Sequence, residues 1–184
     1  NFDLQRGLSK GPDTATFVIV EFADYLCPHC KSAAGPLKTF VSSTPNTKIL
    51  FKPYPLDGTC NTSPGLQGQG DGIRCRLAFA SYCGEKLYKE GFKYHEFIFA
   101  NQEYFHGLSS NADLDTKICS LDESRCAAMK ECMNSEDAMN WVKMSAKEGE
   151  DAKISGTPTI FVNGKKLDGG QNFMVLKSLY KEIN

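Results

Sequence analysis

Three short runs of apolar residues have the composition of buried strands. They cover residues 17–23, 47–54 and 159–162. The first run is apolar at every position except Glu21, which is the pattern of a central strand covered on both faces. After the third run, Asn163-Gly164 is typical of a tight hairpin turn, and residues 165–167 are predicted to return as a short strand.

Helical patterns fill the space between these strands. Residues 31–41 are predicted to form the first helix, with a kink at Gly35-Pro36. The glycine-rich residues 57–72 are predicted to be a loop, and residues 1–16 are predicted to be irregular. The remaining predicted helices are 73–90, 92–101, 114–121, 123–133, 135–152 and, after a break at Gly169-Gly170, 172–183.

The predicted order is β-α-β, then a helical block, then β-β-α. A strand-helix-strand unit of this length favours parallel pairing with a right-handed crossover. The order is that of an α/β thioredoxin fold with an all-helical insertion. We therefore expect residues 1–61 and 151–184 to form the thioredoxin-like domain and residues 62–150 to form the insertion.

Composition narrows the possible functions. The 184 residues suit one domain with an insertion, and the net charge of −1 gives no electrostatic basis for binding nucleic acid or an anionic membrane. No apolar run approaches the ~20 residues of a membrane helix. The chain begins at Asn1 without an initiator methionine or signal peptide, which is typical of a processed product. Eight cysteines favour an oxidising compartment.

The motif Cys27-Pro28-His29-Cys30 follows the first strand and precedes the first helix. In this setting a C-x-x-C motif indicates a redox pair, although zinc sites also use it. Unpaired N–H groups at a helix start stabilise a thiolate and lower the pKa of Cys27, and His29 can add to that effect. Pro28 suits the first helical turn, where a missing N–H costs nothing.

The other cysteines permit three structural disulfides, or several free buried thiols. Cys75 and Cys83 would lie ~12 Å apart on one helix, and Cys126 and Cys132 ~9 Å apart, so neither pair can bond. We favour Cys60 with Cys75. Cys83 would then pair with Cys126 or Cys132, and Cys119 with the one left.

The segments EFADYLCPHC and GTPTIFVNGKKL, together with the helical insertion, resemble the DsbA-like thioredoxin-fold disulfide oxidoreductases. The resemblance spans nearly the whole chain. It implies that Cys27 is the exposed nucleophile, that Cys30 is the buried resolving thiol and that Pro158 is a cis-proline facing the disulfide. The main chain of Thr157 would pair with an extended substrate segment. Without this resemblance, a trans bond before Pro158 would be expected.

The same resemblance places a buried acid at Glu21, with Lys52 as its counterpart. A carboxyl in an apolar strand costs several kcal/mol unless it is paired or protonated, and a raised pKa would let Glu21 relay a proton to Cys30. The alternatives are an outward-facing Glu21 and a solvated Lys52 at the end of its strand.

The resemblance implies an enzyme of the periplasm or another extracytoplasmic space that introduces disulfides into unfolded or reduced proteins. It implies no cofactor beyond the redox-active disulfide and no metal. Thr157 stands where the best-known oxidase has Val and is more frequent in isomerases and reductases, which weakens the oxidase assignment. The six extra cysteines fit variants that work beside, or are fused to, a quinone-linked membrane oxidase of the VKOR or DsbB type. The alternatives are an isomerase or reductase using the same site, and a non-catalytic metal- or peptide-binding module.

Three other residues carry no predicted chemistry. His95 and His106 lack acids or cysteines at ligand spacing, so surface or satisfied interior positions are expected. Trp141 is expected in the core or at an interface.

Overall fold

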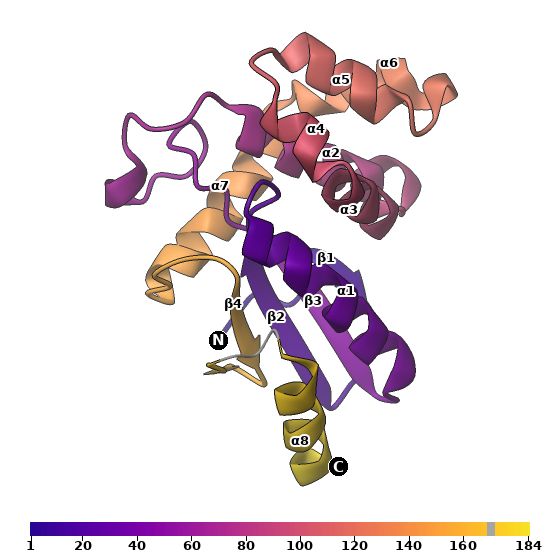
Figure 1. Cartoon of the computed structure of the whole chain (residues 1–184), viewed down its shortest axis with the longest axis vertical. Coiled ribbons are helices and arrows are strands. Elements are labelled where there is room, and N and C mark those ends of the chain that lie inside the picture. The colour runs from indigo at the N-terminus through magenta and orange to yellow at the C-terminus, as the bar shows by residue number, and fades with distance from the viewer. Residues whose placement is uncertain (169–171) are drawn as a thin grey trace.

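The computed structural model of the chain describes residues 1–168 and 172–184 (Figure 1). The predicted break at Gly169-Gly170 lies outside the described residues.

Five strands of the described chain form one mixed sheet, in the order β1-β3-β2-β4-β5. β2 lies at the centre, parallel to β3 and antiparallel to β4. The sequence did not predict β1, because its three residues form a strand only by pairing with β3. The strands are β1 (Leu8–Lys10), β2 (Phe17–Ala23), β3 (Thr47–Pro53), β4 (Thr159–Val162) and β5 (Lys165–Lys166).

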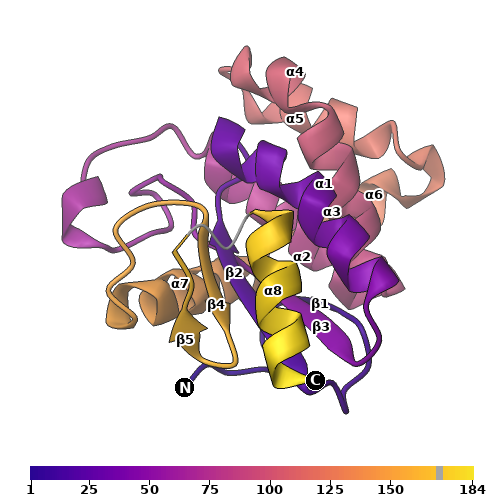
Figure 2. The same cartoon turned by 60° about the horizontal axis from the view of Figure 1, so that its bottom comes forward.

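Both faces of the sheet are covered by helices. On one face lie α1 (Pro28–Ser43) and α8 (Phe173–Ile183), as Figure 2 shows. They pack on Ile19 and Ile49 of the sheet. On the other face, α7 (Glu136–Asp151) packs on alternate residues of the same strands, including Phe22. The period-two alternation of β2 therefore separates two apolar layers.

The remaining helices form the block at the top of Figure 1. The predicted helix 92–101 is followed directly by a short helix that the sequence did not predict. The predicted helix 123–133 begins with a 3₁₀ turn, Glu123–Arg125. Another 3₁₀ turn, Pro64–Leu66, lies in the predicted loop. The helices of this block are α2 (Ile73–Tyr88), α3 (Gly91–Ala100), α4 (Gln102–His106), α5 (Asn111–Cys119) and α6 (Cys126–Met133).

One apolar cluster joins the helical block to the sheet domain. It contains Cys27, Cys30 and Phe51 together with residues of α2 to α7. Trp141 packs at its edge against Tyr82, with ring centroids 5.0 Å apart. The boundaries proposed above, at residues 61–62 and 150–151, remain a prediction.

Three disulfides lie within the helical block or join it to the loop that follows β3. They join Cys60 to Cys75, Cys83 to Cys132, and Cys119 to Cys126. Cys60–Cys75 is the pairing favoured from the sequence. Cys83–Cys132 with Cys119–Cys126 is one of the two remaining combinations that helix geometry left open.

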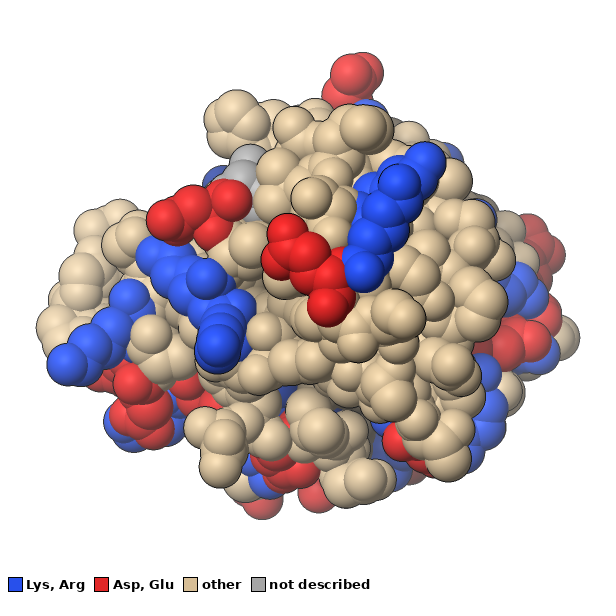
Figure 3. Space-filling model, turned by 90° about the horizontal axis from the view of Figure 1, so that it is seen from below, with Lys and Arg blue, Asp and Glu red and all other residues tan. Residues whose placement is uncertain are grey.

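The outer surface carries no strong charge of one sign on the face seen in Figure 3. Basic and acidic side chains alternate there between wide uncharged areas. No helix among the described residues is long and apolar enough to cross a membrane.

Candidate active site

The end of β2 delivers Cys27 to the first turn of α1. Cys27 is the N-cap residue, and its Sγ accepts a hydrogen bond from the Cys30 N–H at 3.3 Å. Pro28 occupies the first helical turn, as expected from its missing N–H. α1 begins at this motif and not at residue 31, and Gly35 and Pro36 lie inside it.

The two thiols differ strongly in their environment. Hydrogen bonding, first from the Cys30 side chain and also from the main-chain amides of Cys30 and His29, lowers the pKa of Cys27 to about 5. Burial raises the pKa of Cys30 far above its ordinary value. Cys27 therefore carries the thiolate in the dithiol form.

Cys27 is less accessible than the resemblance implies. The residue is 8 % exposed, and Cys30 is fully buried. The Cys27 Sγ lies 3.5 Å from the Thr157 carbonyl oxygen, to which the thiol donates. The Thr157–Pro158 peptide bond is cis. No hydrogen-bond partner for the Thr157 N–H lies within the part of the chain that the structure describes.

Pro28 and His29 are both exposed. The main-chain amide of His29 contributes to the low pKa of Cys27.

Glu21 is buried in the central strand, as predicted, at 2 % exposure. Its Oε1 has no hydrogen-bond partner among the described residues. Burial, and secondarily the nearby Cys27 thiolate, raises the pKa of Glu21 to about 8, so the carboxyl is protonated at neutral pH. It lines a cavity of about 270 Å³ between α1 and α3, together with Leu37, Phe92 and His95.

Lys52 is not the counterpart of Glu21. Glu21 pairs in register with Phe51, so Lys52, one residue on, points to the opposite face of the sheet. There its Nζ donates to Glu148 Oε2 at 2.6 Å and to the carbonyl oxygens of Asp3 and Arg6. Lys52 is fully buried, so the solvated alternative is also wrong.

The comparisons place this geometry in a family. A family model described as thioredoxin matches residues 4–182. The chain belongs to the thioredoxin family.

Solved structures show which form of the thioredoxin fold this is. BdbD from Bacillus subtilis is 21 % identical, with a TM-score of 0.77 covering 98 % of this chain and 94 % of that one. The thiol-disulfide exchange protein α-DsbA2 from Wolbachia pipientis is 20 % identical, with a TM-score of 0.76 covering 99 % and 89 %. The fold is thus DsbA-like, with a helical insert in the thioredoxin arrangement.

Curated relatives of this thioredoxin-family chain are larger proteins. A Na⁺/H⁺ antiporter, NhaA 1 of Salinispora arenicola, is 25 % identical over 185 residues, and NhaA 3 of Salinispora tropica is 23 % identical over 183. The match covers 96 % of this chain and 24 % of each antiporter. The chain therefore spans about a quarter of the length of these relatives. They are named as antiporters and not as oxidases of the VKOR or DsbB type.

Gln102 is a residue of this thioredoxin site that the sequence did not predict, whereas His95 and His106 lie in positions of the kinds expected. Gln102 of α4 donates from Nε2 to the carbonyl oxygens of Tyr25 and Cys27, at 2.8 and 3.0 Å. His95 is buried against the Tyr25 hydroxyl, and burial lowers its pKa to about 3, so it is an uncharged core residue. His106 is exposed. Asp24 was not predicted either. The sequence signal that could have found it is its place, as an acid directly between a buried strand and the cysteine motif.

Proposed function

We propose that this protein is an extracytoplasmic thiol-disulfide oxidoreductase that introduces disulfides into unfolded or reduced proteins. The observation that carries the proposal is the contrast between Cys27, whose pKa falls to about 5, and Cys30, whose pKa rises. A thiol of low pKa is a good leaving group, and stabilising the reduced form makes a disulfide a stronger oxidant. The three additional disulfides support an oxidising compartment.

The reaction has two exchange steps. A substrate thiolate attacks Cys27 Sγ, the Cys27–Cys30 bond breaks, and the Cys30 sulfur leaves and takes up a proton. The second substrate thiolate then attacks the substrate sulfur of the mixed disulfide and releases Cys27 as a thiolate. The substrate dithiol is oxidised and the enzyme disulfide is reduced. The free Thr157 N–H beside the site suits main-chain pairing with an extended substrate.

A second protein must then reoxidise the Cys27–Cys30 pair. A quinone-linked membrane oxidase of the VKOR or DsbB type remains our proposal for that partner. The transport activity named for the antiporter relatives belongs to proteins of which this chain matches about a quarter.

The test is oxidation of a reduced, unfolded protein by the oxidised enzyme, followed by gel analysis of free and mixed disulfides. Wild-type protein should oxidise the substrate stoichiometrically, Cys27→Ser should be inactive, and Cys30→Ser should accumulate a mixed disulfide. Removing both Cys119 and Cys126, remote in sequence from the motif, should preserve activity. Full steady-state activity of Cys30→Ser would refute the mechanism.

The alternatives give different results in the same experiment. An isomerase or reductase would be isolated reduced and would act on substrates that already contain disulfides. A binding module would show no turnover and would hold metal or peptide at Cys27 and Cys30 in stoichiometric amount.

A further inference from the structure

Asp24 contacts the redox motif through its entire main chain. Its N–H donates to Cys30 Sγ at 3.5 Å, and its carbonyl oxygen accepts from the Cys27 N–H at 3.2 Å. The residue thus lies between β2 and the cysteines and touches both of them. Any change in its position moves the turn that carries the two sulfurs.

The Asp24 side chain holds that turn to the rest of the fold. Its Oδ1 accepts from the Leu26 N–H at 2.7 Å, and its Oδ2 accepts from the Leu56 N–H at 2.6 Å, just after β3. The residue is 1 % exposed. A buried carboxylate is costly unless hydrogen bonds and a countercharge compensate it.

Arg74 supplies the countercharge. Its Nη1 lies 2.6 Å from Asp24 Oδ1, and within the described residues it is the cation that pairs with Asp24. Arg74 stands in the first turn of α2, one residue before Cys75. The ion pair therefore connects the redox motif to the beginning of the helical block.

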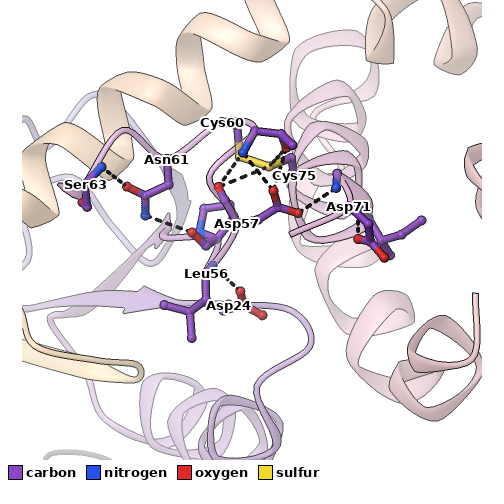
Figure 4. The surroundings of a disulfide bond; sticks show 12 residues. Asp24, Leu56, Asp57, Cys60, Asn61, Ser63, Asp71 and Cys75 are labelled. Atoms are coloured by element: carbon purple, nitrogen blue, oxygen red, sulfur yellow. Dashed lines mark hydrogen bonds between the residues drawn. A yellow bond between two sulfur atoms is a disulfide. The ribbon is translucent and has the colours of Figure 1, made fainter. Parts of the chain in front are cut away.

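The start of α2 is fixed in turn by the loop that follows β3, as Figure 4 shows. The Cys60–Cys75 disulfide ties this loop to the helix. The fully buried Asp57 accepts from the Gly72 N–H at 2.9 Å and from the Thr59 hydroxyl at 2.7 Å. The same short loop thus contacts Asp24 at Leu56 and anchors the residue next to Arg74 at Cys60.

We propose that the Asp24–Arg74 ion pair is a positioning unit for the Cys27–Cys30 thiols, and that the Cys60–Cys75 disulfide keeps Arg74 in place. The inference deepens the proposed function, because it concerns the same thiol pair. With Arg74 removed, the Asp24 carboxylate beside the turn has no countercharge, and its field disfavours the Cys27 thiolate. The Cys27–Cys30 disulfide of the variant is then a weaker oxidant than that of the wild type.

The primary test compares Arg74→Ala with Arg76→Ala. Arg76 lies two residues further along α2 and forms its own buried pair, with Asp115, at 2.6 and 2.7 Å. Thiolate absorbance against pH gives the Cys27 titration, and equilibration with glutathione gives the redox equilibrium constant. We expect Arg74→Ala to make the thiol pair more reducing, with a three- to tenfold change in the redox equilibrium constant, and to raise the pKa of Cys27. We expect Arg76→Ala to lower stability without changing either value. Arg74→Lys, which keeps the positive charge, should return both values most of the way to those of wild type.

A second test addresses the disulfide. Replacing Cys60 and Cys75 with Ser should move the Cys27 titration in the same direction as Arg74→Ala and add little when combined with it. Replacing Cys119 and Cys126 should leave the titration unchanged. Where Arg74→Ala does not fold, Arg74→Gln, which keeps a donor but not the charge, supplies the comparison.

The inference would be overturned if wild type, Arg74→Ala (or Arg74→Gln) and Arg76→Ala had the same Cys27 pKa and redox equilibrium constants within twofold of one another. An equal shift in both arginine variants would also overturn it, because the effect would then be a general loss of packing. A wild-type protein that proves to be a reductant would contradict the proposed function. The difference between the variants would still test the positioning role.

Discussion

At the scale of single residues, the proposed thiol-disulfide exchange depends on the different environments of two neighbouring sulfurs. Cys27 lies at the helix start, where N–H groups stabilise its thiolate, whereas Cys30 is enclosed one turn further on. The pKa of the first falls and that of the second rises. In the proposed mechanism, this asymmetry makes Cys27 the point of attack and the leaving group.

The pH dependence of alkylation tests this asymmetry. In reduced protein, the rate of modification of Cys27 by iodoacetamide should be half-maximal near pH 5, because only the thiolate reacts. Mass spectrometry should find Cys30 unmodified. Cys27→Ser is the control, and a midpoint near the ordinary thiol value of about 8.5 would contradict the account.

Glu21 provides a second test at this scale. Its folded-state pKa of about 8 lies above the ordinary 4.5, so the unfolded chain ionises first and the wild type loses stability as pH rises from 4.5 to 8. Relative to Glu21→Gln, this loss should reach roughly 4 kcal/mol at pH 8. Urea unfolding of the proteins at pH 4.5 and 8, with the Cys27–Cys30 pair reduced, measures it. A stability difference that does not change with pH would mean that Glu21 is not buried as a neutral acid.

At the scale of elements, the alternation of side chains along β2 and β3 decides which groups can meet. Glu21 points toward α1, and Lys52 points toward α7, where it meets Glu148. Lys52 is therefore a structural cation that ties the N-terminal segment and α7 to the sheet. Glu21 lies on the face that carries the thiols.

Lys52→Met separates these roles. Losing one partner of a buried ion pair should cost about 3 kcal/mol, measured by urea unfolding. The Cys27 titration should stay where it is in wild type, because Lys52 lies on the other face of the sheet. A raised or lowered Cys27 midpoint in this variant would instead support a link between Lys52 and the active site.

The sequence predicted the long, strongly patterned elements well. The run from Phe17 to Ala23 is buried on both sides, as its apolar composition requires. β1 was missed, because a three-residue strand depends on its partner and not on its own pattern. The face of Lys52 was also out of reach, since the register between two strands is a tertiary property that composition does not encode.

The site itself was only partly readable from the sequence. The cysteine motif and Thr157-Pro158 could be recognised, because each stands at a boundary between elements. Arg74 and Gln102 could not, because Arg74 lies 50 positions from Asp24 and Gln102 lies 75 positions from Cys27, and each pair meets only after the helical block folds.

At the scale of the whole molecule, the disulfides distribute stability unevenly. Chain-entropy arguments relate the stabilisation to the length of the loop that each bond closes. The separations are 49 residues for Cys83–Cys132, 15 for Cys60–Cys75 and 7 for Cys119–Cys126. Both Cys83–Cys132 and Cys60–Cys75 lie in the core cluster that joins the helical block to the sheet.

Removing each pair in turn by substitution with Ala should therefore lower stability in that order. The expected losses are about 4, 3 and 2 kcal/mol, measured by urea unfolding under non-reducing conditions. Wild-type protein assayed in parallel is the reference. A larger loss for Cys119–Cys126 than for Cys83–Cys132 would contradict the ranking.

The reduction potential of the Cys27–Cys30 pair tests the central claim most directly. It is measured by equilibration in glutathione buffers, with the other cysteines mapped by mass spectrometry in the same samples. The account predicts a value near the oxidising end of the family, about −120 mV, as expected for a stabilised Cys27 thiolate. A value near about −270 mV would make the protein an electron donor and would contradict the proposed oxidase function.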